Sequence, residues 1–93
     1  MLEFEQLKLR LEANEDELRD LKDALGYSRL KNEIEELEAK TAAPGFWDDT
    51  ENSQKILKKT GKLKNTVEAY EKLCGAYDDM LVLIEMGDEE EDL

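Results

Sequence analysis

The chain has no histidine, one cysteine and one proline, and only 6% of its 93 residues are aromatic. Without histidine and with a single thiol, a zinc site is not expected, and Cys74 cannot form an internal disulfide. No apolar run approaches the roughly 18 residues of a membrane-spanning helix, and the first residues lack the regions of a secretory signal. These absences indicate a cytoplasmic protein without a membrane partner.

Catalytic patterns are missing as well. The sequence has no Gly-x-Ser-x-Gly, no phosphate-binding glycine loop and no Gly-x-Gly-x-x-Gly. Its adjacent acidic pairs, Asp48/Asp49 and Asp78/Asp79, would project about 100° apart on a helix, so neither pair converges on a substrate. We therefore expect no catalytic residue, no cofactor and no metal.

What the chain has in abundance is charge. Charged residues make up 41% of it, the net charge is −12 and the sequence pI is about 4.4. This composition is typical of long helices or coiled coils. Disorder is the rival interpretation, but the regular spacing of the apolar residues argues against it. The acidic balance also argues against DNA or an anionic membrane as a partner.

The apolar residues recur at helical intervals in three segments. They predict helices at about residues 2–25, 29–42 and 49–86. The fold expected is all-α and a single domain over residues 1–93, built either as an elongated antiparallel helical hairpin or as a three-helix bundle, with coiled-coil-like packing. The choice depends on whether the first two helices are collinear or folded back.

Two of these segments carry a heptad seam. The first seam is interrupted by Asn14, which either fixes the register as a buried polar residue or is solvated. The second seam runs without a slip from residue 56 to 84, and Thr60 is its only clearly polar member. Gly61 and Gly75 lie just outside this seam and each cost about 1 kcal/mol relative to alanine. The acidic residues after Gly87 are expected to fray.

Local residues suggest where the helices end. A left-handed glycine at Gly26 would end the first helix, and Ser28 would cap the second. Pro44 disfavours helix at the residue before it. Asp48, with Glu51 three residues later, has the form of a capping box for the third helix.

The corner between the second and third segments is Pro-Gly-Phe-Trp-Asp-Asp, residues 44–49. Pro44, Phe46 and Trp47 form this structural corner. Either both aromatic rings plug the open end of the hairpin, or they are exposed and anchor a partner.

Five lysines and no acids lie between residues 52 and 67. Lys55, Lys58 and Lys62 share one face of the predicted helix, opposite the seam. This face is either solvated, or complementary to the glutamates of the second segment, or a local phosphate-contacting patch on an acidic protein.

Five motifs follow one another along the chain: Leu-x-x-Leu-x-x-x-Leu-Gly-Tyr, Leu-x-x-Glu-Ile-x-x-Leu-Glu, Pro-Gly-Phe-Trp-Asp-Asp, Lys-x-x-x-Leu-Lys-x-Thr-Val-Glu-x-Tyr and Glu-Met-Gly-Asp-Glu-Glu-Glu. Motifs in this order resemble the N-terminal helical domain of the bacterial peptide chain release factor 2 family, which belongs to the class I release factors. The corner is the most specific of them.

The resemblance implies an accessory role in translation termination at UGA and UAA codons. It implies two partners for the full-length protein: the ribosome, at the base of the large-subunit stalk, and a GTPase release factor. The family reads codons with Ser-Pro-Phe and promotes hydrolysis with Gly-Gly-Gln. Neither motif occurs here, so the chain is expected to be a fragment of a longer protein without hydrolytic activity.

Two further expectations concern association. If a later helix normally covers Leu73, Met80 and Leu83, the chain alone would expose them, and self-association would hide them. The alternative function is a stand-alone acidic coiled-coil adaptor or scaffold, which would fit the heptads equally well.

Overall fold

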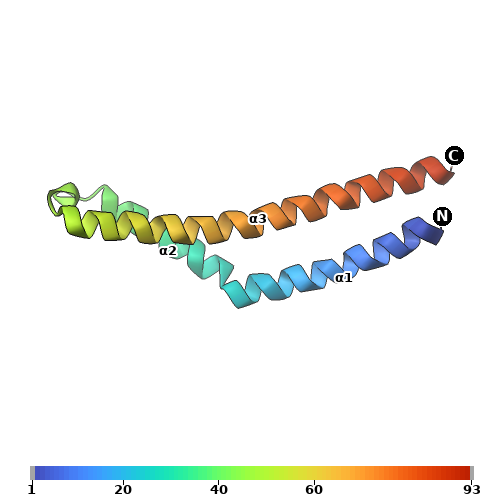
Figure 1. Cartoon of the computed structure of the whole chain (residues 1–93), viewed down its shortest axis with the longest axis horizontal. Helices are drawn as coiled ribbons and strands as arrows, with labels where there is room; N and C mark the ends of the chain where they lie inside the picture. The colour runs from blue at the N-terminus through green and yellow to red at the C-terminus, as the bar shows by residue number, and fades with distance from the viewer. Residues whose placement is uncertain (1, 93) are drawn as a thin grey trace. The chain divides into compact units, whose positions relative to one another are not determined.

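The computed structural model describes residues 2–92, and the side chains of residues 3–87. The elements are α1 (Leu2–Leu25), α2 (Tyr27–Thr41), a 3-10 turn η1 (Phe46–Asp48) and α3 (Thr50–Asp92), as Figure 1 shows. No strand occurs within residues 2–92, and the predicted all-α class is confirmed. The chain divides into unit 1, Met1–Ala24 with Tyr70–Leu93, and unit 2, Leu25–Ala69.

Unit 1 pairs α1 with the C-terminal part of α3 in antiparallel fashion (Figure 1). The direction follows from two contacts, because Phe4 lies against Gly87 while the Tyr77 hydroxyl donates a hydrogen bond to Glu15 Oε2 at 3.2 Å. A later residue of α1 therefore meets an earlier residue of α3. The buried seam residues of this unit are Leu11, Tyr70 and Ile84.

The third helix is longer than predicted, because α3 continues through Asp92 and does not end at about residue 86. Fraying after Gly87 stays a prediction. A Cβ at Gly87 would lie 2.6 Å from Cε1 of Phe4. Gly87 thus lets the Phe4 ring approach α3 closely, and the glycine does not end the helix. The glutamates that follow are good helix formers, which helps α3 to continue beyond the predicted end at residue 86.

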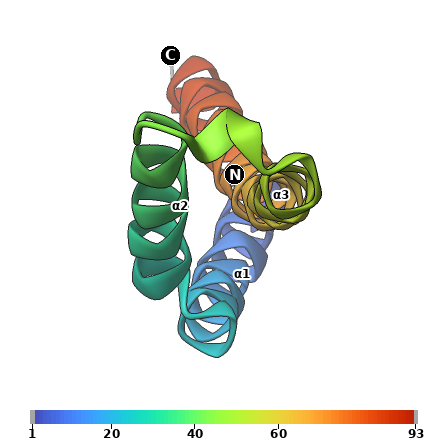
Figure 2. The same cartoon turned by 90° about the vertical axis from the view of Figure 1, so that its left-hand side faces the viewer.

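Unit 2 joins α2 to the first part of α3 through the corner, as Figure 2 shows, and the chain reverses direction there (Figure 1). Its buried apolar residues include Leu37 and Val67. Two hydroxyls are buried with them, and both are satisfied within α3. Ser53 Oγ donates to the Asp49 carbonyl at 2.8 Å, and Thr60 Oγ1 donates to the Ile56 carbonyl at 2.8 Å. A polar residue at seam position 60 is tolerated for this reason.

The break between α1 and α2 is one residue long. Gly26 adopts the left-handed conformation that the sequence predicted, with φ 65° and ψ 48°. The expected cap at Ser28 is wrong, because α2 already begins at Tyr27 and Gly26 occupies the cap position. The Gly26 carbonyl accepts the first helical hydrogen bond from Leu30 N at 2.9 Å.

The N-cap of α3 lies one residue later than the predicted capping box places it. Asp48 lies in η1, and the residue that caps α3 is Asp49, whose Oδ1 accepts a hydrogen bond from Asn52 N at 3.1 Å. The predicted role of Asp48 is therefore wrong. An extra 3-10 turn in the corner, closed by Asp48 N to the Gly45 carbonyl at 3.1 Å, delays the start of the helix.

Asp49→Ala should destabilise unit 2 by about 1 kcal/mol, because an N-cap carboxylate satisfies an otherwise unpaired amide and interacts well with the helix dipole. Urea unfolding followed by circular dichroism measures this loss. Asp48→Ala is the matched control and should change stability less. Equal losses of stability in the two variants would mean that Asp48 also caps α3.

Candidate functional site

The lysine stripe, Lys55, Lys58 and Lys62, lies on the first part of α3 within unit 2. All three side chains are exposed, while Thr60 and Val67 on the opposite face are buried. Among the described residues none of the three forms an ion pair. The helix therefore presents three uncompensated positive charges to solvent on one face.

The other two lysines of this run are used internally. Lys59 Nζ pairs with Glu33 Oε1 of α2 at 3.1 Å, and Lys64 pairs with Glu38. The hydrogen bond to Glu38, and then its negative charge, raise the pKa of Lys64. Pairing with the glutamates of the second segment was one alternative for the stripe, and Lys59 and Lys64 form those pairs instead.

The corner separates its two aromatic residues. Phe46 is 8% exposed and Trp47 is 61% exposed, with their rings edge to face at a centroid distance of 4.9 Å. Neither alternative from the sequence holds for both rings: Phe46 is buried, as a plug requires, and Trp47 is exposed, as an anchor requires. Successive residues of a 3-10 turn project about 120° apart, so only one of the two can face the helices.

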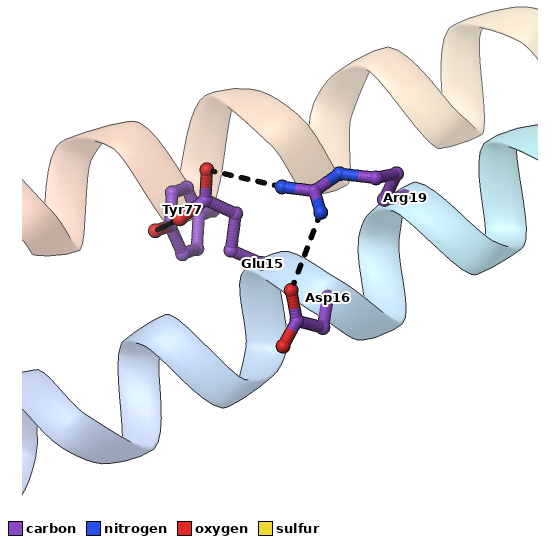
Figure 3. A network of polar contacts seen from close by, with 4 residues as sticks. All are labelled: Glu15, Asp16, Arg19 and Tyr77. Carbon is purple, nitrogen blue, oxygen red and sulfur yellow. Dashed lines mark hydrogen bonds and ion pairs between the residues drawn. The ribbon is translucent and has the colours of Figure 1, made fainter.

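Unit 1 contains a polar network between its two helices. Figure 3 shows Arg19 beside Glu15 and Asp16 on α1, with Tyr77 reaching across from α3. The Arg19 guanidinium is 3.5 Å from Asp16 Oδ1 and 3.8 Å from Glu15 Oε1. An open cavity of about 280 Å³ adjoins this network. Half-buried Cys74 also lines it.

Ionisation of Tyr77 should lower the stability of unit 1 at alkaline pH. Partial burial, and then the hydrogen bond to Glu15, raise the pKa of the Tyr77 hydroxyl above its ordinary value of 10.0. When folding raises the pKa of a group, its contribution to stability is fully present at pH values below the ordinary pKa. That contribution is lost as the pH rises through the folded-state pKa. Tyr77→Phe should weaken this alkaline loss of stability, as measured by urea unfolding across the alkaline range. An unchanged profile would contradict the role of Tyr77.

Unit 1 also exposes apolar side chains. Leu73, Met80 and Leu83 are each more than half exposed, as expected. Leu73 and Met80 border an open, mainly apolar cavity of about 200 Å³, which Asn14 also lines. Asn14 is exposed, which supports the solvated interpretation of this residue. Self-association through this surface stays a prediction.

Within the described residues, no cluster of three histidine, cysteine or acidic side chains could hold a metal ion. In the same part of the chain, no helix is long and apolar enough to cross a membrane.

These features define an all-α chain with an exposed lysine stripe on unit 2 and exposed apolar side chains on unit 1; that residues 1–93 form a single domain stays a prediction. The chain belongs to the PCRF domain family, whose model matches residues 30–93. That match contains α2 from Leu30 onwards, the corner and α3. No solved structure was found to match the chain.

Relatives named peptide chain release factor 2 match most of the chain. The protein of Streptomyces avermitilis is 40% identical over 75 residues, which cover 81% of this chain and 20% of that protein. The protein of Lactiplantibacillus plantarum is 31% identical over 91 residues, covering 98% and 24%. That of Petrotoga mobilis is 24% identical over 90 residues, covering 97% and 24%. The resemblance seen in the sequence is confirmed, and the chain spans about a fifth to a quarter of these relatives.

Proposed function

We propose that the chain is the accessory N-terminal domain of a peptide chain release factor that directs translation termination at UGA and UAA codons. The observation that carries this proposal is the family match over residues 30–93, together with relatives named peptide chain release factor 2. The match includes the Pro-Gly-Phe-Trp-Asp-Asp corner, which is the most specific motif of the resemblance.

The role proposed for these residues is recognition and positioning. In the longer protein, other residues would read the codon and promote hydrolysis of the peptidyl-tRNA ester, because the chain covers only 20–24% of the relatives. The proposed partners are the ribosome, at the base of the large-subunit stalk, and a GTPase release factor. The proposed location is the cytoplasm, where ribosomes work.

A chimaera tests the proposal. This chain would replace the matching segment of the Streptomyces avermitilis release factor 2, and peptide release would be measured on ribosomes stopped at UGA, UAA or UAG. We expect release at UGA and UAA close to that of the unmodified factor, and none from the 93-residue chain alone.

An adaptor unrelated to termination would leave the chimaera well below the unmodified factor at every codon. A second chimaera, carrying an unrelated antiparallel helical hairpin of the same length, is the control. If this control releases peptide as well as the chimaera with the native chain, the accessory role is wrong.

A further inference from the structure

We propose that the outer face of the first part of α3, formed by Lys55, Lys58, Gly61 and Lys62, binds the sugar–phosphate backbone of large-subunit ribosomal RNA. Gly61 would mark the point of closest approach. The choice of ribosomal RNA rests on the proposed function, whereas the backbone-binding chemistry rests on the geometry of unit 2.

The first support is how the charge is distributed. Unit 2 has eight basic and eight acidic residues, so its formal charge is zero and the entire net charge of −12 belongs to unit 1. The negative charge of unit 1 would repel a polyanion, whereas unit 2, with a formal charge of zero, would not repel it. An acidic protein can therefore still present a local RNA-binding face.

The second support is that only some of the lysines on this part of α3 form ion pairs. Lys59 and Lys64 form ion pairs with α2, whereas the stripe has none among the described residues. Three exposed lysines at positions i, i+3 and i+7 follow one line along a helix. The lysine ammonium is a compact point charge that suits phosphate oxygens.

The third support is Gly61, which has no structural reason to be glycine. A Cβ at this position would meet nothing within 4 Å, and the residue does not have a positive φ. By contrast, Gly26 and Gly45 have positive φ, and Gly87 contacts the Phe4 ring. Glycine in a helix interior lowers stability, and here it leaves bare backbone beside Lys58 and Lys62. A partner backbone could approach the helix closely at this point.

The neighbouring side chains favour RNA over a protein partner. Gln54 and Asn65 are exposed near the stripe and can donate hydrogen bonds to phosphate or ribose oxygens. Leu57 is 45% exposed and lies one turn before Gly61, at the edge of this face, whereas Leu63 is half-buried. Protein interfaces usually need an apolar centre, which the stripe does not provide.

Binding of the purified chain to protein-free large-subunit ribosomal RNA tests the charge part of the proposal. Filter binding would be measured between about 50 and 200 mM salt. Replacing Lys55, Lys58 and Lys62 together with glutamine should weaken binding at least tenfold at the low-salt end. It should also reduce the slope of log affinity against log salt by about 2–3, because each lost phosphate contact contributes about 0.7–0.9.

The control replaces three exposed lysines outside the stripe, Lys31, Lys40 and Lys72, with glutamine. This variant loses the same number of positive charges as the stripe variant. Its affinity for the RNA should stay within about twofold of that of the native chain, because only lysines that contact phosphates contribute to binding. Equal losses in the two triple variants would overturn the proposal. So would a native chain that does not bind the RNA at low salt.

Two alanine substitutions test the role of Gly61. Gly75 also has open space around its Cβ but lies in the acidic unit 1. Gly61→Ala and Gly75→Ala should each raise Tm, by up to about 4–8 °C for a domain of this size. Only Gly61→Ala should weaken RNA binding, by several-fold. Equal RNA binding in the two variants would remove Gly61 from the site.

The release assay with the chimaera decides the proposed function separately. If the chimaera carrying the three stripe substitutions releases peptide normally and the chain binds RNA independently of the stripe, this inference fails and the proposed function stands. If the native chimaera is inactive while the chain binds RNA through the stripe, the proposed function fails and backbone recognition stands.

Discussion

Phe46→Ala should lower the free energy of unfolding by about 3–5 kcal/mol, the cost of emptying the site of a buried phenylalanine. Phe46 is 8% exposed and lies in η1 at the corner between α2 and α3. Since small domains are stable by only about 5–15 kcal/mol, this loss would remove a large share of the stability of unit 2. Far-UV circular dichroism in a urea series measures the change.

Trp47→Ala is the matched control, because it removes the adjacent and larger ring. Trp47 is 61% exposed and touches Phe46 through an edge-to-face contact. We expect a loss of about 1 kcal/mol or less, which is the typical value of such a pair. A loss at Trp47 equal to that at Phe46 would mean that both rings plug the hairpin, which was one of the two alternatives from the sequence.

The comparison of Phe46 with Trp47 shows what the sequence can and cannot predict. Apolar periodicity located all three helices, because a helix that buries one face must repeat its apolar residues. It could not decide which of two consecutive aromatic residues turns inward. That depends on the backbone path through Gly45, with φ 79°, and on the 3-10 turn that follows it.

The helix ends show the same limit. Gly26 ends α1 as predicted because few other residues adopt its left-handed conformation readily. Ser28 and Asp48 are suitable capping residues, yet the caps fall elsewhere, because neighbouring residues compete for each end. Gly87 was expected to precede a frayed end, but it is a contact point for Phe4, a residue 83 positions earlier in the chain. No local pattern reports such a contact.

The candidate site was predictable only as a set of alternatives. The spacing of Lys55, Lys58 and Lys62 placed them on one face, which the structure confirms. Which lysines remain free depends on where Glu33 and Glu38 lie across the hairpin. The open space around Gly61 is likewise visible only in the structure, because the sequence shows only that the glycine is unfavourable in a helix.

Leu11→Ala should destabilise unit 1 by about 2–5 kcal/mol. Leu11 is 4% exposed and lies in the seam between α1 and α3, whereas Leu9 on the same helix is 65% exposed. Leu9→Ala deletes the same atoms from a solvated position and should change stability by about 0.5 kcal/mol or less. The chain provides a reporter for this unit, since its only cysteine, Cys74, is half-buried there.

Modification of the half-buried Cys74 by a thiol reagent should become faster when unit 1 opens locally. Leu11→Ala should therefore speed its modification strongly, and Leu9→Ala should leave the rate nearly unchanged. Trp47, the only tryptophan, reports on unit 2 in the same samples through its fluorescence. If Leu11→Ala shifts the unfolding transitions of both reporters equally, the two units unfold as one cooperative structure through the continuous α3. A shift confined to Cys74 would mean that unit 1 opens while the corner and the lysine stripe stay folded.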